Sequence, residues 1–305
     1  MNLPAQRGVA IVMAMSVVAL AAIATTAMMA TQSTWSRETE LQFNHAQAQV
    51  LIQAGVDWAR AVLSDDRRMN NVDHLKEPWA LRLPPMPVDN GELAGYIEDQ
   101  QGAFNLNNLV LGGKVSVVQL ERFRRLLAIL NLPTTLADSL ADWIDADSIP
   151  QPNGGAEDEY YLSLQPPYLA ANRPLTDVAE LVLVRGFNDQ VRARLSPFVS
   201  ALPANTAVNV NTASPEVLSA VIEGLDLDTA RALVAQRERA YFRDYADFSS
   251  RLPHGIEIAN NDLKVSSNYF LARVRVTIGS AEARGMALLV RTDIGWPAIV
   301  WRKYQ

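Results

Sequence analysis

A long hydrophobic run opens the chain. The range 9–30 is apolar except for one serine and two threonines, and no charged side chain lies anywhere in the range 8–36. About 20 apolar helical residues cross the hydrocarbon core of a bilayer, where charged groups are costly. The run therefore predicts a transmembrane helix, and Arg7 before it favours a cytoplasmic amino end.

The helical pattern continues past the predicted membrane edge. Apolar residues recur at three- and four-residue spacing as far as Leu63, and the range 9–63 contains no proline and one glycine. This spacing predicts one helix, 9–63, roughly 80 Å long, whose first half is apolar all round and whose second half is amphipathic. A cleaved secretory signal has a shorter apolar region, about 7–15 residues, and is the weaker alternative. A plain signal anchor is another alternative.

The carboxy-terminal part alternates with a period of two. From 269 to 278, every second residue is apolar and most of the residues between them are polar, which predicts a strand with one polar face. The ranges 284–292 and 298–304 follow after short turns, so we expect an antiparallel meander. A further strand is predicted at 91–101. The helical region 105–267 is therefore inserted into a β domain made of 64–104 and 268–305.

Two segments of this insertion, 174–200 and 211–250, follow the same helical-hairpin pattern. Thr176 and Ser214 are the predicted N-caps. Four residues of the first segment have counterparts 38 residues later, which indicates a duplicated SAM-like or helix-hairpin-helix unit: Leu183, Gly186, Phe187 and Leu195 correspond to Val221, Gly224, Leu225 and Leu233.

Helical hairpins of this kind often bind DNA through a Gly-apolar-Gly turn whose amides hold a phosphate. The second glycine of that turn is Asn188 in the first copy and Asp226 in the second. An aspartate there repels phosphate, and a pI near 5.2 argues against a general nucleic-acid coat. We therefore predict a structural or protein-contact role, with no DNA-binding residues and no nucleic-acid partner.

The net charge of −6 comes from one segment. No lysine or arginine lies between Arg125 and Arg173, and the remainder of the chain is nearly neutral. The segment holds seven acidic residues: Asp138, Asp142, Asp145, Asp147, Glu157, Asp158 and Glu159.

The order of elements in this acidic segment predicts a metal site. A helix at 136–144 leads to Asp145 and Asp147, a turn rich in Pro and Gly reverses the chain, and 157–159 brings back three more carboxylates. Such clusters repel each other unless a cation lies between them. The chain has no cysteine and no histidine nearby, so oxygen ligands favour calcium, with magnesium second and zinc disfavoured. A solvated acidic loop is the alternative.

Enzyme motifs are absent from the sequence. It contains no GxSxG, no phosphate-binding glycine loop and no HExxH. The three histidines, His45, His74 and His254, lie far apart along the chain. We therefore expect no catalytic residues.

The amino terminus resembles a type IV prepilin, because a short leader ending in Arg7-Gly8 precedes an apolar helix that runs on into a soluble domain. The resemblance implies that a prepilin peptidase cuts after Gly8 and that Val9 becomes an N-methylated terminus. Pilins usually carry Glu five residues into the mature chain, where this sequence has Met13. The K-type minor pseudopilin of type II secretion is the branch that lacks this Glu.

The acidic segment is also similar to the K-type pseudopilin, since it reads DWIDAD at 142–147 and GGAED at 154–158, followed by two tyrosines. That family binds calcium in its helical insertion. The resemblance implies Asp145, Asp147, Glu157 and Asp158 as preferred ligands, and it extends the set to Asp142 and Glu159.

The resemblance covers nearly the whole chain and implies an α+β pilin fold, in which a long amino-terminal helix packs on a small antiparallel sheet and carries a large helical insertion. It implies a structural subunit at the pseudopilus tip that joins the I- and J-type minor pseudopilins and helps to initiate and cap the filament. The chain would cross the inner membrane once, with its globular part in the periplasm. A membrane-anchored DNA receptor is the alternative, because 208–216 resembles competence proteins.

Overall fold

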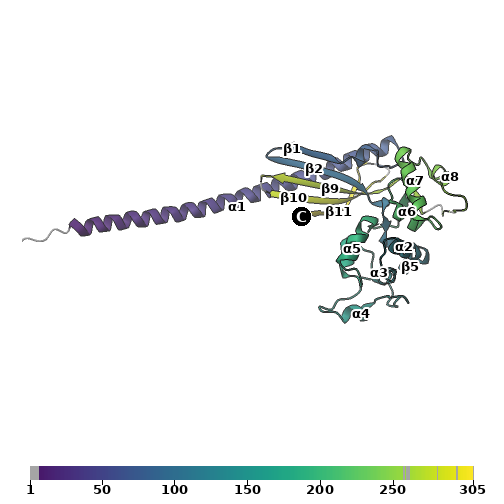
Figure 1. The fold of residues 1–305 in the computed structure, drawn as a ribbon. Helices are drawn as coiled ribbons and strands as arrows, with labels where there is room; N and C mark the ends of the chain where they lie inside the picture. The colour runs from purple at the N-terminus through teal and green to yellow at the C-terminus, as the bar shows by residue number, and fades with distance from the viewer. Residues whose placement is uncertain (1–6, 257, 259–261, 280, 293–294, 305) are drawn as a thin grey trace, which may run out of the picture.

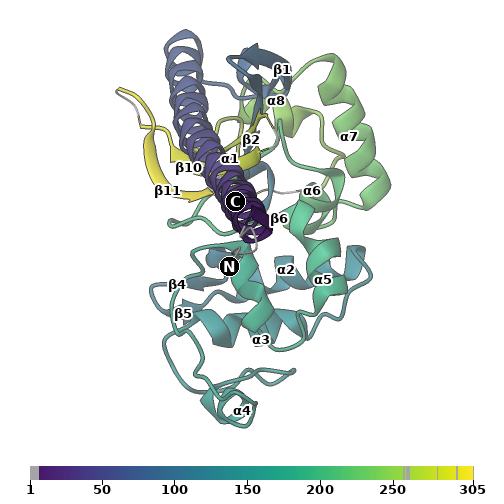
Figure 2. The ribbon, with the colours of Figure 1, turned by 90° about the vertical axis from the view of Figure 1, so that its left-hand side faces the viewer.

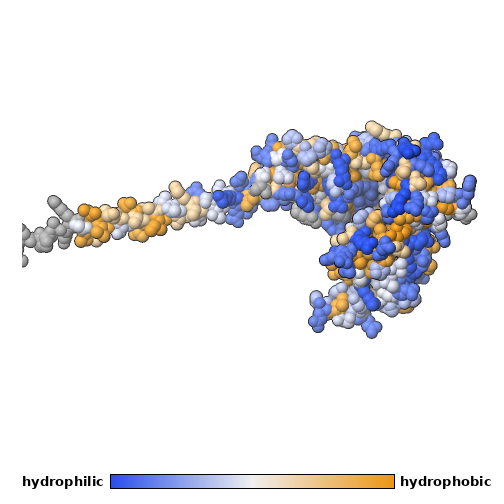
Figure 3. Space-filling view, in the orientation of Figure 1, coloured by the Kyte–Doolittle hydropathy of each residue, from blue (hydrophilic) through white to orange (hydrophobic). Residues whose placement is uncertain are grey.

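The computed structural model describes residues 7–256, 258, 262–279, 281–292 and 295–304. Its longest element is α1 (Arg7–Met69), whose first half projects from the globular head as a stalk (Figure 1). The apolar part of α1 is fully exposed and long enough to cross a membrane. Apolar residues cover this part, and polar residues begin where the stalk approaches the globular head (Figure 3).

The second half of α1 packs on a sheet of five antiparallel strands in the order β1-β2-β9-β10-β11. The last three strands form the expected meander. The strands are β1 (Leu83–Val88), β2 (Gly91–Asp99), β9 (Tyr269–Ile278), β10 (Ala281–Val290) and β11 (Ala298–Tyr304).

A hydrophobic core lies between α1 and the sheet. Ile52 and Leu63 of α1 are buried against Phe270 and other inward residues of β9 and β10. The helix and sheet approach closely at Gly285, where a Cβ would lie 2.1 Å from Ile52 Cγ2. The second half of α1 and the sheet therefore share one hydrophobic core.

The insertion leaves the sheet at the end of β2 and returns at the start of β9, and it has a separate hydrophobic core. Figure 2, which looks along α1, shows it lying beside and below the sheet. Its α-helices are α2 (Val117–Ile129), α3 (Leu136–Ile144), α4 (Asp158–Leu162), α5 (Asp189–Leu195), α6 (Pro215–Val221), α7 (Leu227–Arg239) and α8 (Tyr245–Ser250).

Short strands and 3₁₀ turns connect these helices. The strand pairs are β3 (Phe104–Asn105) with β6 (Val199–Ser200), β4 (Val110–Leu111) with β5 (Lys114–Val115), and β7 (Val208–Asn209) with β8 (Leu263–Lys264). The 3₁₀ turns are η1 (Pro78–Ala80), η2 (Gln100–Gly102), η3 (Leu106–Leu109), η4 (Val178–Leu183) and η5 (Ser196–Phe198).

Several boundaries in the β domain differ from the sequence prediction. β10 spans Ala281–Val290 and not 284–292, and β2 ends at Asp99 and not at 101. α1 continues six residues beyond Leu63, to Met69, because Ser64 and Asp66 of its last turns are buried and Asp66 pairs with Arg291. β1 was not predicted, since half of its six residues are proline. Proline is tolerated there because β1 is an edge strand, whose outer N–H groups need no partner.

The first helical hairpin also differs in detail. The prediction of Thr176 as the N-cap is wrong, because the Asp177 side chain caps η4 by accepting from Ala179 N. The segment after it is a tighter 3₁₀ helix, so Leu183 is 43% exposed whereas its counterpart Val221 is buried. In the second hairpin, Ser214 caps α6 as predicted.

Candidate metal centre

The acidic segment folds as two short helices joined by a turn that reverses the chain. Asp145 is the C-cap of α3, and its extended backbone directs the chain out of the helix. The chain turns through 150–155 and returns at Glu157, the N-cap residue of α4. Ser139 Oγ donates to Gly154 O over 2.7 Å, which fastens the turn to the side of α3.

Three carboxylates meet here, and we call Asp145, Asp147 and Glu157 the acidic triad. Each places one oxygen within 4.8 Å of the other two. Asp145 is fully buried and Glu157 is 6% exposed, and none of their four carboxylate oxygens has a hydrogen-bond partner among the described residues. Asp147 lies at the exposed rim, where its Oδ1 accepts from Ile149 N over 2.9 Å. Because buried polar groups are nearly always paired, the four oxygens point to a ligand.

The electrostatics of the acidic triad lead to the same conclusion. Burial, reinforced by Asp147 and Asp142, raises the pKa of Asp145 to about 7. Burial and the neighbouring carboxylates, Asp142 first, also raise the pKa of Glu157 to about 7. Burial, Asp147 and Asp142 all raise the pKa of Asp145, so no base among the described residues offsets its charge. A bound cation would supply the missing positive charge.

The other three predicted ligands lie beside the triad and not within it. Asp142 is buried and accepts from Gln151 N, and burial raises its pKa to about 6. Asp158 Oδ1 accepts from Ala170 N over 2.9 Å. Glu159 is exposed on α4. The structure thus brings together three of the six predicted residues, and backbone amides hold the carboxylates of two others.

The acidic triad fits a hard cation. All of its donors are carboxylate oxygens, which suit calcium and magnesium and not zinc. Calcium accepts six to eight oxygens in irregular geometry, whereas magnesium requires near-octahedral geometry and usually keeps several waters. The uneven burial of the three groups and the irregular loop that carries Asp147 favour calcium.

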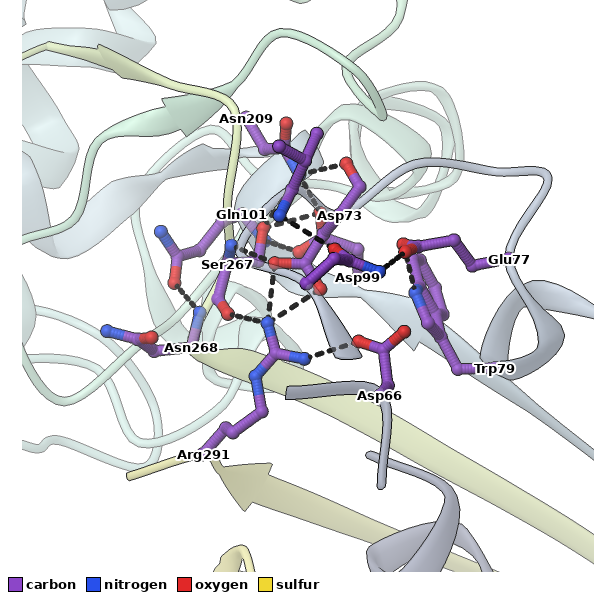
Figure 4. Close-up of polar contacts among 12 residues, drawn as sticks. Asp66, Asp73, Glu77, Trp79, Asp99, Gln101, Asn209, Ser267, Asn268 and Arg291 are labelled. Carbon is purple, nitrogen blue, oxygen red and sulfur yellow. Dashed lines mark hydrogen bonds and ion pairs between the residues drawn. The ribbon is translucent and has the colours of Figure 1, made fainter. Parts of the chain in front are cut away.

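A second buried acidic cluster, which the sequence did not reveal, lies where the end of α1 meets the insertion (Figure 4). We call Asp66, Asp73, Glu77 and Asp99, together with Arg291, the joint cluster. Arg291 is buried and donates Nη1 to Asp66 Oδ2 (2.8 Å) and Nη2 to Asp73 Oδ1 (2.6 Å). This cluster therefore contains its own cation.

The remaining members of the joint cluster are paired with neutral donors. Glu77 Oε2 accepts from Trp79 Nε1 over 2.8 Å. Asp99 Oδ2 accepts from Ser267 Oγ and Thr212 Oγ1, each over 2.6 Å, and from Asn209 Nδ2. These bonds join the sheet to the insertion through residues distant in sequence. Burial raises the pKa of Asp66 to about 7, reinforced by the neighbouring acids and opposed by Arg291.

Comparison with known proteins assigns the family. Two family models, both described as type II secretion system protein K, match residues 102–204 and 208–266. A type II secretion system protein K from Pseudomonas aeruginosa is 40% identical over 286 residues, covering 90% of this chain and 85% of that protein. The chain belongs to the type II secretion system protein K family.

Other members of the family extend the match to nearly the full length. The protein K of Klebsiella pneumoniae is 32% identical and covers 98% of this chain and 96% of its own length. Among solved structures, the GspK-GspI-GspJ complex from enterotoxigenic Escherichia coli matches with a TM-score of 0.78 and 28% identity over 88% of this chain and 99% of that one. The pilin-like fold predicted from the sequence is confirmed, and the family is a structural component of the secretion machinery.

The prepilin-like residues lie at the start of α1. Gly8 and Val9 fall in its first turn, and beyond the helix itself no described residue lies within 4 Å of a Cβ placed on Gly8. Met13 is 66% exposed on the bare part of the stalk. The predicted processing site therefore makes no contact with the described part of the folded head.

The hairpin turns explain why the second glycine is missing. Asn188 caps α5 by accepting from Val191 N, and Asp226 caps α7 by accepting from Asp228 N and Thr229 N. The amides that would hold a phosphate are thus bound by side chains. Arg237 is buried and donates to two backbone carbonyls, so it is not available to DNA.

Proposed function

We propose that this chain is a minor pseudopilin at the tip of the type II secretion pseudopilus, where it helps to initiate and cap the filament. The observation that carries the proposal is the position of the insertion. It lies at the end of α1 furthest from the apolar stretch and projects to one side of the helix axis (Figures 1 and 2). A subunit stacked above along the same axis would meet this bulk.

The chemistry of α1 supports the same role. The fifth residue after Gly8 is Met13, so the chain has no carboxylate there to pair with the amino terminus of a subunit above. On the side of α1 away from the sheet, Phe43 and Val50 are each 68% exposed. They are seven residues apart and so lie on one helix face, where they suit packing against a partner helix.

The proposed partners are the I- and J-type minor pseudopilins, since the matching solved structure is a complex of three such proteins in Escherichia coli. We propose that a prepilin peptidase cleaves after Gly8 and that Val9 is then methylated. The chain would cross the inner membrane once, with its amino end cytoplasmic and its head periplasmic. Mass spectrometry of the mature amino terminus tests the processing step, and an intact Met1 would contradict it.

We further propose that calcium binds at the acidic triad. Asp145, Asp147 and Glu157 would hold the ion, with Asp142, Asp158 and Glu159 within the surrounding acidic shell. The ion supplies positive charge that lets the buried carboxylates stay ionised. Through Ser139 and the 150–155 turn, the residues around the ion would keep α3 and α4 fixed relative to each other, which stabilises the insertion.

The tip assignment can be tested directly on filaments. We expect gold-labelled antibody against the insertion to mark filament ends in cells that overproduce the major pseudopilin. We also expect the purified chain to form a stable complex with the I- and J-type subunits. Label spread along the filament would contradict the tip position, and failure to form the complex would contradict the partnership.

A further inference from the structure

The two outer edges of the sheet differ in chemistry. Pro84, Pro85 and Pro87 occupy half of β1, so this strand lacks three N–H donors and its outer edge is poorly suited to pair with another strand. β11 contains no proline. It pairs with β10 on one side, and no other described strand pairs with its outer edge. Only the β11 edge can therefore offer a full row of backbone donors and acceptors.

The side chains along β11 suit strand pairing. Its sequence, AIVWRKY, is rich in β-branched and aromatic residues. Val300 is 39% exposed and Tyr304 is 50% exposed, and Trp296 in the preceding turn is 51% exposed. A register shift at Leu288/Leu289 leaves the pairing regular again from Trp301 to Tyr304. The regular part of the edge thus carries two aromatic and two basic side chains, and no described strand pairs with its outer side.

The charges on β11 define the partner. Arg302 and Lys303 are successive strand residues, so their side chains lie on opposite faces of the sheet. Lys303 Nζ already pairs with Asp177 of the insertion over 2.7 Å, and Arg302 Nη1 donates to Gln53 Oε1 on α1. An added strand with carboxylates would meet a base on either face. A second copy of this chain would instead place bases opposite bases, which destabilises a strand pair.

The position of β11 beside α1 indicates where the partner is anchored. Arg60 Nε donates to Pro297 O over 2.7 Å and Ser64 Oγ to Gly295 O over 3.3 Å, so the turn before β11 is fixed to the helix. Gln53 lies roughly 35 Å along α1 beyond the end of the apolar run at Ala30. A neighbour with its own long membrane helix beside α1 would hold its head at this height, which raises its effective concentration at the edge.

We propose that β11 is a strand-addition edge, at which a neighbouring membrane-anchored pseudopilin of I or J type pairs an extended segment that carries Asp or Glu. This inference rests on the proposed function, since it names the surface by which the partner is bound. Backbone hydrogen bonds would supply affinity, and the two bases would select an acidic strand over a basic one.

Hydrogen exchange on the full-length complex with the I- and J-type subunits tests the pairing. We expect exchange of every second amide from Trp301 to Tyr304 to slow at least tenfold on complex formation, with no change in β1. If the complex forms and β11 exchange is unchanged, the inference is wrong while the proposed function stands. If no complex forms, the proposed function itself fails.

Cross-linking identifies the occupant, because the chain has no native cysteine. Val300→Cys and Tyr304→Cys, labelled with a thiol-reactive photocross-linker in membranes, should link to an acidic segment of one partner subunit. The matched control is Met86→Cys on β1, which is 42% exposed and should give no adduct. Equal adducts from Met86→Cys, or adducts with a second copy of the chain or with an exported protein, would overturn the proposal.

Charge reversal tests the selection of an acidic strand. Arg302→Glu combined with Lys303→Glu should weaken binding of the I- and J-type subunits at least tenfold. The control pair, Arg239→Glu with Arg243→Glu, makes the same charge change at exposed sites on the insertion and should leave binding unchanged. Unchanged circular dichroism shows that each variant is folded. Equal weakening by both pairs would contradict the inference.

Discussion

Removing calcium should weaken this protein in a strongly pH-dependent way. The pKa of Asp145 and that of Glu157 are each raised to about 7 in the folded, ion-free protein. In the unfolded chain these values are about 4. The stability that the two groups contribute is therefore complete below about pH 4 and is lost as the pH rises through about 7. Bound calcium would reverse this loss, because it would bind the ionised carboxylates.

The magnitude follows from the size of the shift. A rise of about three pKa units corresponds to roughly 3–4 kcal/mol for a buried carboxylate such as Asp145. A ligand present at 100 to 1,000 times its Kd adds about 2.7 to 4.1 kcal/mol, which is enough to offset this cost. At roughly 2–4 °C per kcal/mol, chelation at pH 8 should lower Tm by about 5–16 °C. At pH 5.5 the change should be less than about 2 °C.

The measurement is thermal unfolding of the full chain in detergent, with and without chelator, followed by tryptophan fluorescence. Trp143 is a suitable reporter, because it lies in α3 and makes an edge contact with Tyr161 at 5.0 Å. Limited proteolysis of the 146–153 loop reports local opening. Both measurements should show the same dependence on pH.

Isosteric variants separate loss of the ion from loss of the fold. Asp145→Asn with Glu157→Gln should abolish the response to chelator. In chelator at pH 8 this variant should also unfold at a higher temperature than the unmutated chain, because neutral amides avoid the cost of buried charge. Asp189→Asn, which removes an exposed carboxylate on α5, should respond as the unmutated chain does. A response to chelator equal at both pH values, or none at all, would refute the reasoning.

Three further predictions concern the fold. Arg291→Met should cost about 3–5 kcal/mol in urea denaturation, since it leaves Asp73 buried and unpaired; a cost below 1 kcal/mol would contradict the role of the joint cluster. Gly285→Ala should cost about 1–3 kcal/mol, because its Cβ would lie 2.1 Å from Ile52 Cγ2, and it should cost less in a chain where Ile52→Ala has removed that Cγ2. Asp226→Ala should cost about 1 kcal/mol through loss of the α7 cap and should not create DNA binding in a gel-shift assay; a DNA complex at physiological salt would contradict the structural role of the turn.

Elements with strong local patterns were predictable from the sequence. α3 and β11 have the predicted bounds, Leu136–Ile144 and Ala298–Tyr304, because helical and alternating apolar positions define them without help from tertiary contacts. β1 was missed, since proline disfavours a strand locally and only its edge position permits one. Thr176 was misassigned as a cap because Asp177, one residue later, competes for the same amides.

The acidic segment was recognisable because its carboxylates are close together in sequence and no base lies between Arg125 and Arg173. The sequence could not show which three carboxylates form the triad, because that depends on how the turn folds. At Gly155, a Cβ would lie 2.2 Å from Asp142 Oδ2, so only glycine lets the turn pack against α3. Asp142 therefore packs against the turn, and Asp145 and Glu157 lie close to each other in the triad.

The joint cluster could not be predicted, since Arg291 and Asp66 are 225 residues apart and meet only after the sheet has formed. Its comparison with the acidic triad is the strongest internal argument for a metal. Both sites bury several carboxylates, and in both the pKa of an aspartate is raised to about 7. In the joint cluster Arg291 opposes that rise, whereas burial, Asp147 and Asp142 all raise the pKa of Asp145. The acidic triad is open to solvent on the side of Asp147, and this difference from the joint cluster supports the proposal that it takes a cation from solution.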